Sequence, residues 1–351
     1  MIETPSLPPS AELQSDPLPL PGRPFGRVAR NVIGYGVLIA LMGVTVMVVF
    51  VPAALIHCAL RNGRRAAWLA LTIATALVAM YVAGAPTATP DLEKMAWSLV
   101  AALVLAIALP SMVALPLIER GEAFGRVLVF LLVASAVGLA VTEMGALALA
   151  SFSPYAGLVV QAKQFWAEIM KFYQANGMPA EATRAFEHNM GYALIVMPAW
   201  MLIEITVMFV LSLLMIGRLK TWRDHVERRG GTDAPRTYLF RNLSLPDWVL
   251  FGFILGGLTP IAHGLVQTVA ANVLAVVVFL YMLQGLAIFR FMLVAVGAGL
   301  SATLLGWALL VFLSFTGMGP LLLGLAGLFD PFFDFRHFKK RKDDSHESHS
   351  D

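Results

Sequence analysis

Runs of about 20 apolar residues recur along most of this 351-residue chain. A helix of that length crosses the roughly 30 Å hydrocarbon core of a bilayer and satisfies its own backbone hydrogen bonds there. Hydrophobic residues make up 58% of the sequence and charged residues 13%, whereas soluble domains have roughly 45–50% and about 25%. The alternating pattern of a membrane barrel is not visible. The sequence therefore predicts an all-α polytopic membrane protein.

The apolar segments can be delimited by their polar and basic flanks. They span residues 31–60, 66–84, 95–118, 124–150, 191–216, 248–264, 265–288, 291–315 and 320–335. The first is long enough to be double. We expect a bundle of about eight to ten transmembrane helices, some of them short, kinked or re-entrant.

The first segment contains Pro52 two thirds of the way along. Three arginines precede it and three follow it: Arg23, Arg27, Arg30, Arg61, Arg64 and Arg65. Because basic residues next to apolar segments favour the cytoplasmic side, both groups are expected there. A kinked hairpin or re-entrant segment that turns near Pro52 is therefore favoured over one long span.

The chain divides into a Pro-rich arm (1–27), a helical membrane domain (28–338) and a charged tail (339–351), and the arm and tail are predicted to be disordered. Residues 151–190 are predicted to be an extracytoplasmic amphipathic insertion. Its apolar residues recur at helical spacing: Leu158, Ala162, Phe165, Trp166, Ile169, Phe172 and Tyr173. Such a helix lies at the membrane interface or, alternatively, caps the mouth of a cavity.

Residues 217–247 form a basic loop, which is expected to be cytoplasmic. The basic block 339–342 places the C-terminus on the same side, and the N-terminus is expected there too. The net charge of +3 does not predict nucleic-acid binding, because the basic residues lie in short loops beside apolar segments. The expected partners are the lipid bilayer, a small-molecule ligand or other membrane subunits.

Polar side chains inside the apolar segments are candidate functional residues, because an ionised group at the bilayer centre costs at least about 2.5 kcal/mol. They are Glu143, Glu204, His263, Gln267, Asn272, Gln284 and Arg290. In one interpretation they line a substrate cavity. In the other, the amides join helices by hydrogen bonds, and Arg290, beside an expected bend at 284–285, reaches the interface.

Signatures of enzymes are missing from the sequence: there is no HExxH, no phosphate-binding P-loop, no G-x-S-x-G and no cysteine pair. The chain is predicted not to be an enzyme, and no cofactor or metal is expected. The tail histidines, His337, His346 and His349, are interpreted as solvated residues.

Four short motifs occur in order: Leu245-Pro246-Asp247-Trp248, Asn272-Val273-Leu274, residues 281–287 (YMLQGLA) and residues 327–336 (GLFDPFFDFR). Together they resemble the YybS-like family of bacterial multi-pass membrane proteins, a domain of unknown function. The resemblance implies the bacterial inner membrane and a distant similarity to the substrate-binding S components of energy-coupling-factor transporters. It carries over no catalytic residue, so Gln284, Asp330 and Arg336 are candidates by position only.

The last motif contains Asp330, Asp334 and Arg336, and Pro331 is expected to interrupt its helix. Asp330 then ends the last segment, Asp334 lies beside Arg336, and an Asp–Arg pair is expected at the membrane boundary. The leading hypothesis for the whole chain is a small-molecule-binding transporter component. The alternatives are a non-transporting scaffold or assembly factor and, less favoured, an intramembrane enzyme.

Overall fold

The computed structural model describes residues 25–86, 89–228, 238–333 and 335–336, and these ranges are helical, without a β-strand. The first half contains α1 (Phe25–Gly43), η1 (Val46–Phe50), α2 (Val51–Asn62), α3 (Arg64–Gly84), α4 (Pro90–Ala102), the π-helix η2 (Leu103–Ala108), α5 (Leu109–Val113), α6 (Leu115–Glu119) and α7 (Phe124–Ala150). The second half contains α8 (Pro154–Ala175), α9 (Ala180–Ile195), α10 (Met197–Arg218), α11 (Lys220–Glu227), η4 (Phe240–Asn242), α12 (Val249–Gly256), α13 (Gly264–Ala295), α14 (Leu300–Phe315) and α15 (Met318–Phe333). Most of the predicted arm, the tail, part of the basic loop (229–237) and Asp334 lie outside the described residues.

Five helical runs in the described part are long and apolar enough to cross a membrane: α3, Pro90–Glu119, α7, α10 and α13. A sixth crossing results if α14 and α15, which meet at 109°, count as one broken span. The expected count of about eight to ten is not confirmed. Several predicted segments form helices that are too short, since α12 has 8 residues and α14 and α15 have 16 each, while a span needs about 20.

The predicted boundary between the segments 265–288 and 291–315 is wrong. α13 is one helix of 32 residues that continues through Arg290, and the chain breaks only at Gly297, whose φ of +68° favours glycine. The bend expected at 284–285 is also absent. A single arginine near a helix end does not interrupt the backbone hydrogen bonds, because its long side chain can reach out of the apolar layer.

The predicted hairpin at the start of the membrane domain is present, but its turn precedes Pro52. α1 ends at Gly43, and Thr45 caps the next turn by accepting a hydrogen bond of 3.3 Å from the Met47 amide. Pro52 lies in the first turn of α2, where a residue without an N–H is tolerated.

α1 lies beside α3 and runs in the same direction. A Cβ added at Gly36 would lie 2.7 Å from Ile73, and one at Gly43 would lie 3.8 Å from Val78. α2 then returns, because only Gly63 separates its last residue from the first residue of α3. Both ends of the hairpin therefore lie near the start of α3. The first apolar segment is therefore a helical hairpin, and each of its two helices is shorter than a full span. That it re-enters the membrane stays a prediction.

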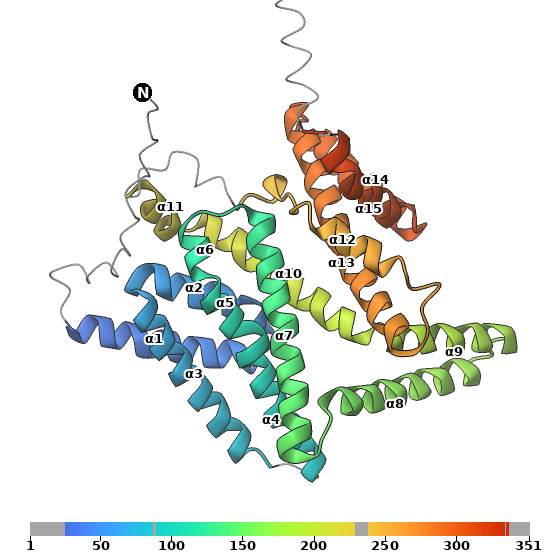
Figure 1. The fold of residues 1–351 in the computed structure, drawn as a ribbon, viewed down its shortest axis with the longest axis horizontal. Helices are drawn as coiled ribbons and strands as arrows, with labels where there is room; N and C mark the ends of the chain where they lie inside the picture. Colours follow the sequence, from blue (N-terminus) through green and yellow to red (C-terminus); the bar gives the residue numbers. More distant parts are fainter. Residues whose placement is uncertain (1–24, 87–88, 229–237, 334, 337–351) are drawn as a thin grey trace, which may run out of the picture.

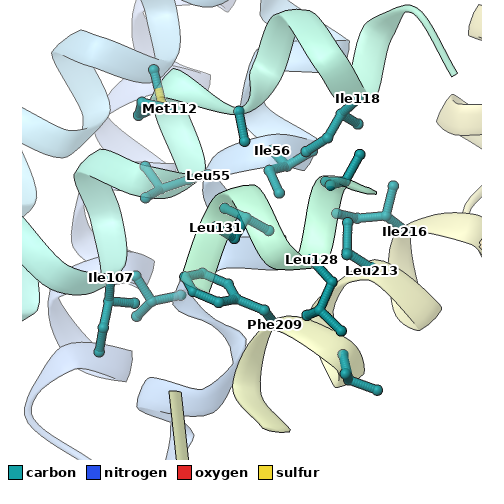
Figure 2. Packing of buried hydrophobic residues seen from close by; sticks show 14 of the residues in the cluster. Leu55, Ile56, Ile107, Met112, Ile118, Leu128, Leu131, Phe209, Leu213 and Ile216 are labelled. Carbon is teal, nitrogen blue, oxygen red and sulfur yellow. The ribbon is translucent and has the colours of Figure 1, made fainter. Parts of the chain in front are cut away.

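α2 lies at the centre of the bundle and is buried along most of its length. Figure 2 shows Leu55 and Ile56 of α2 packed among Leu128 and Leu131 of α7 and Phe209 of α10. α3 contributes a stripe of buried alanines: Ala66, Ala67, Ala70 and Ala74. Small residues let helices approach closely, and close packing is the main attraction between helices in lipid.

The amphipathic segment forms two helices, α8 and α9, that project from the bundle (Figure 1). Gly177, with a φ of +83°, ends the first, and Pro179 is the N-cap of the second. The apolar face of α8 is largely uncovered, with Phe165 59% and Phe172 66% exposed. An amphipathic helix is therefore present, while its extracytoplasmic location stays a prediction.

Contacts between distant segments define two ends of the bundle. Arg64 at the start of α3 pairs with Glu119 at the end of α6, and the Thr221 hydroxyl on α11 lies 3.0 Å from His57 Nδ1 on α2. We call this the basic end, formed by residues 57–65, 119–126, 218–228 and 238–245. The opposite end carries α8 and α9 (Figure 1).

Candidate functional site

Residues from three of the four family-like motifs meet where α13 crosses α15. The Leu245 amide donates a hydrogen bond of 3.0 Å to Gln284 Oε1. The Nε2 of the same side chain donates at 3.0 Å to Asp330 Oδ2. Gln284 and Asp330 are only 1% and 7% exposed. We call Leu245, Gln284, Asp330 and Arg336 the polar node.

Arg336 completes the polar node from the end of the chain. Its Nε lies 3.6 Å from Asp330 Oδ2. Its two terminal nitrogens donate to the carbonyls of Arg241, at 3.2 Å, and Leu243, at 2.5 Å. Arg336 therefore pairs with Asp330, whereas Asp334, the acid expected beside it, lies outside the described residues. The guanidinium fastens the end of α15 to the basic loop.

α15 continues through Pro331 to Phe333, so the expected interruption does not occur. A proline cannot donate a hydrogen bond to the carbonyl four residues earlier, and its ring crowds that carbonyl. Here that carbonyl belongs to Gly327, within two turns of the helix end, where the loss of one bond does not break the helix.

Glycines allow the close approach on which the polar node depends. A Cβ at Gly285 of α13 would overlap the Leu323 carbonyl of α15, and one at Gly327 would overlap the Tyr281 carbonyl. Because each glycine meets the other helix's backbone, the two helix axes can come close enough for Gln284 to reach Asp330. Gly285 thus serves packing rather than the expected bend.

The carboxylate of Asp330 is only partly engaged. Its Oδ2 faces both Gln284 and Arg336, while its Oδ1 is buried and has no hydrogen-bond partner among the described residues. Chemically, the polar node is a fixed, charge-assisted bridge with one spare acceptor position. Its geometry suits holding three segments together.

Asn272 joins the two helices of the α9–α10 bend to α13. Its Oδ1 accepts from the Ala199 amide and its Nδ2 donates to the Ile195 carbonyl, both at 2.8 Å. These two backbone groups are four residues apart, so they would bond to each other in an unbroken helix. The break at Val196 separates them, and the carboxamide of Asn272 takes the place of the missing bond.

Glu143 organises the elbow between α7 and α8. Its carboxylate accepts from the Ser153 hydroxyl and, at 3.0 Å, from the Tyr155 amide. It therefore satisfies a free N–H at the start of α8, as acidic groups commonly do at helix N-termini. The Tyr155 hydroxyl donates to the Leu194 carbonyl at 3.2 Å and ties α8 to α9.

The other predicted residues do not join these clusters. His263 precedes α13 in an extended conformation, so it does not share a helical face with Gln267, and both are exposed. Arg290 is half-buried near the end of α13, and Glu204 is exposed in the middle part of α10. The expected polar stripe along one helix is therefore absent, because its members lie on different faces and at different ends.

A cluster of buried aromatic residues at the basic end was not predicted from the sequence. Trp222 is fully buried beside Tyr238, with ring centroids 5.1 Å apart, and Phe124 meets the same tyrosine edge-on at 5.9 Å. Burial raises the pKa of Tyr238, and the nearby negative charge of Glu122 raises it further. The sequence signal for this cluster was the presence of Trp222 and Tyr238 in an otherwise basic and polar loop.

The hollows of the described structure include a small apolar cavity and an open groove. The apolar cavity lies between α1, α2, α3, α4 and η2 and has a volume of about 10 Å³, room for about one water molecule. An open groove of about 270 Å³ runs along α8, lined by Phe165, Glu168, Ile169, Phe172 and Tyr173. Neither hollow contains any of the residues that the sequence singled out inside the apolar segments. The expectation of no metal and no cofactor stays a prediction.

Comparison with known proteins places the chain in one family and gives no further relative. A family model described as a predicted membrane protein (DUF2232) matches residues 32–331. The match covers all four motifs except the end of the last one, in agreement with the resemblance to YybS-like membrane proteins. No curated protein and no solved structure matches the chain.

Proposed function

The chain belongs to the DUF2232 family of predicted membrane proteins, and from the way its polar side chains are used we propose that it is a non-transporting membrane scaffold or assembly factor. Such a protein holds a fixed helical framework against which other membrane components assemble. Its expected partners are the bilayer and other membrane subunits.

The use of the intramembrane polar groups supports this role most directly. Asn272 bridges the break between α9 and α10, and Glu143 caps the start of α8. Gln284 joins α13 to α15 and to the loop around Leu245 that precedes α12. Each of these side chains forms hydrogen bonds to other groups of the protein itself. A substrate site would instead present several such groups to one cavity. A small-molecule-binding role, as in S components, stays a prediction.

We also propose that the protein lies in a bacterial inner membrane with its basic end and both termini in the cytoplasm. Many described arginines gather at that end: Arg61, Arg64, Arg65, Arg120, Arg126, Arg218, Arg223, Arg228 and Arg241. Arg336 reaches the same place from the C-terminal end of α15. This asymmetry favours a cytoplasmic basic end.

Cysteine labelling tests the orientation. In a Cys58→Ala background, a cysteine at Arg223 on α11 should be protected from a membrane-impermeant reagent added to intact cells, and one at Lys171 on α8 should react. Both positions are exposed, and Cys58 is the only native cysteine. The reverse pattern would overturn the proposed orientation.

Two measurements test the scaffold role. A thermal-shift screen of small metabolites on the purified protein should give no saturable increase in melting temperature. A photo-cross-linking residue at Arg223 should give a discrete protein adduct in cells. The same residue at Leu309, an exposed apolar position of α14, should give none.

A metabolite that raises the melting temperature, with an effect lost in Arg290→Ala, would replace the scaffold by a small-molecule binder. Absence of any adduct at Arg223 would also overturn the scaffold role, since the basic end would then have no stable protein partner.

A further inference from the structure

One face of α10 is uncovered along most of the membrane span. Its residues recur at intervals of three and four: Trp200, Glu204, Val207, Leu211 and Met215. Four are apolar and between 37% and 57% exposed. The spacing is that of a helical seam that meets another helix. We call this set the α10 seam.

Glu204 distinguishes the α10 seam from a surface that only contacts lipid. Its carboxylate is exposed and takes part in no hydrogen bond or ion pair among the described residues. It lies seven residues after Met197, about 11 Å from the start of a helix that is long and apolar enough to cross a membrane. A carboxyl group there requires a polar partner or a shared proton.

Arg290, the cation that the sequence places inside the apolar segments, does not lie level with Glu204. Asn272 of α13 meets the start of α10 at Ala199, and Glu204 lies about 8 Å beyond that point along its helix. Arg290 lies about 27 Å beyond it along α13. Because copies in one membrane share an orientation, Arg290 of a second copy would not meet Glu204.

Glu204 of a second copy, by contrast, does lie level with Glu204 of the first. A two-fold axis normal to the membrane places the same residue of both copies at the same depth and brings the same surface of each together. Two carboxyl groups at such an axis can share a proton, so that each gives the other the polar partner it lacks.

We propose that the α10 seam is the interface of a homodimer in which the two Glu204 carboxyl groups meet at the two-fold axis and share a proton. The apolar members of the α10 seam pack on either side of this pair. The dimer does not depend on the scaffold role, because a scaffold can also act as a monomer.

Disulfide cross-linking in native membranes tests the dimer. In a Cys58→Ala background, Val207→Cys, one turn from Glu204, should form a disulfide-linked dimer on mild oxidation. Leu149→Cys, 91% exposed near the end of α7, is the control and should stay monomeric. The purified Cys58→Ala protein should have the mass of two chains by light scattering with detergent subtracted.

Substitution of the carboxyl group separates a specific contact from crowding. With Val207→Cys present, Glu204→Gln keeps a hydrogen-bonding side chain of the same size and should retain most of the cross-linked product. Glu204→Leu should reduce it at least fivefold. Circular dichroism should show that both variants remain helical.

A monomeric mass together with no cross-link at position 207 would overturn the dimer. Equal cross-linking of Glu204→Leu and Glu204→Gln would also overturn it, since the carboxyl pair would then have no part in association. Cross-linking from position 207 to a different protein would replace the dimer by a hetero-complex and leave the scaffold role standing.

Discussion

Gln284 on α13 donates a hydrogen bond of 3.0 Å to the carboxylate of Asp330 on α15, 46 residues further along the chain. Both side chains are buried. The same glutamine accepts from the loop that precedes α12, so one carboxamide connects three segments. In an apolar surrounding, an amide whose oxygen and nitrogen both have partners fixes one helix register, because any shift would leave buried polar groups without partners.

Replacing Gln284 by leucine should lower the free energy of unfolding by about 1–3 kcal/mol, because the Leu245 amide and Asp330 each lose a partner in a buried site. Thermal unfolding in detergent would measure the change. Gln267→Leu on the same helix is the matched control and should shift stability by less than about 0.5 kcal/mol, since that side chain is exposed. Equal shifts for the two variants would contradict the bracing role of Gln284.

Gly285→Ala should destabilise the protein by about 1–3 kcal/mol, because its methyl group would collide with the Leu323 backbone and force α13 away from α15. Gly145→Ala on α7 is the control, as a Cβ there meets nothing within 4 Å. Alanine should be neutral or slightly stabilising at that position, given its higher helix propensity. Unfolding in mixed detergent micelles compares the two, and a neutral Gly285→Ala would exclude the close crossing.

Asn272→Ala should release the Ala199 amide and the Ile195 carbonyl at the α9–α10 break. Hydrogen exchange at Ala199 should accelerate by about tenfold or more, which corresponds to the loss of roughly 1.4 kcal/mol of local protection. Mass spectrometry of peptides across the break would detect it. Asn176→Ala, at the exposed end of α8, should leave the exchange at Ala199 unchanged, and an unchanged rate in Asn272→Ala as well would refute the bridge.

The pKa of Tyr155 is raised, first by burial and second by the negative charge of Glu143. The neutral phenol is therefore favoured in the folded state, and the stability it contributes is present below the usual tyrosine pKa and is lost as pH rises above it. Glu143→Gln removes the smaller cause, so Tyr155 should ionise at a lower pH than in the unaltered protein. Phenolate absorbance, with Tyr155→Phe to identify the signal, would follow this, and an unchanged titration would contradict the contact.

The sequence by itself determined the helical membrane class, the hairpin in the first apolar segment and the amphipathic helix in the insertion, because each depends on local properties. Segment length, flanking charge, helical spacing and turn-forming residues act over a few neighbours. It also singled out Gln284, Asp330 and Arg336, through their motifs.

Only the tertiary structure decided how the polar residues are used and where several helices end. Asn272, Gln284 and Gln267 are all amides within one apolar stretch of the sequence. Asn272 and Gln284 bridge distant segments, whereas Gln267 is exposed. Gly285 suggested a bend but serves a close helix crossing. The physical reason is that hydrogen-bond partners and close approaches come from residues far away in sequence, and local patterns carry no record of which residues these are.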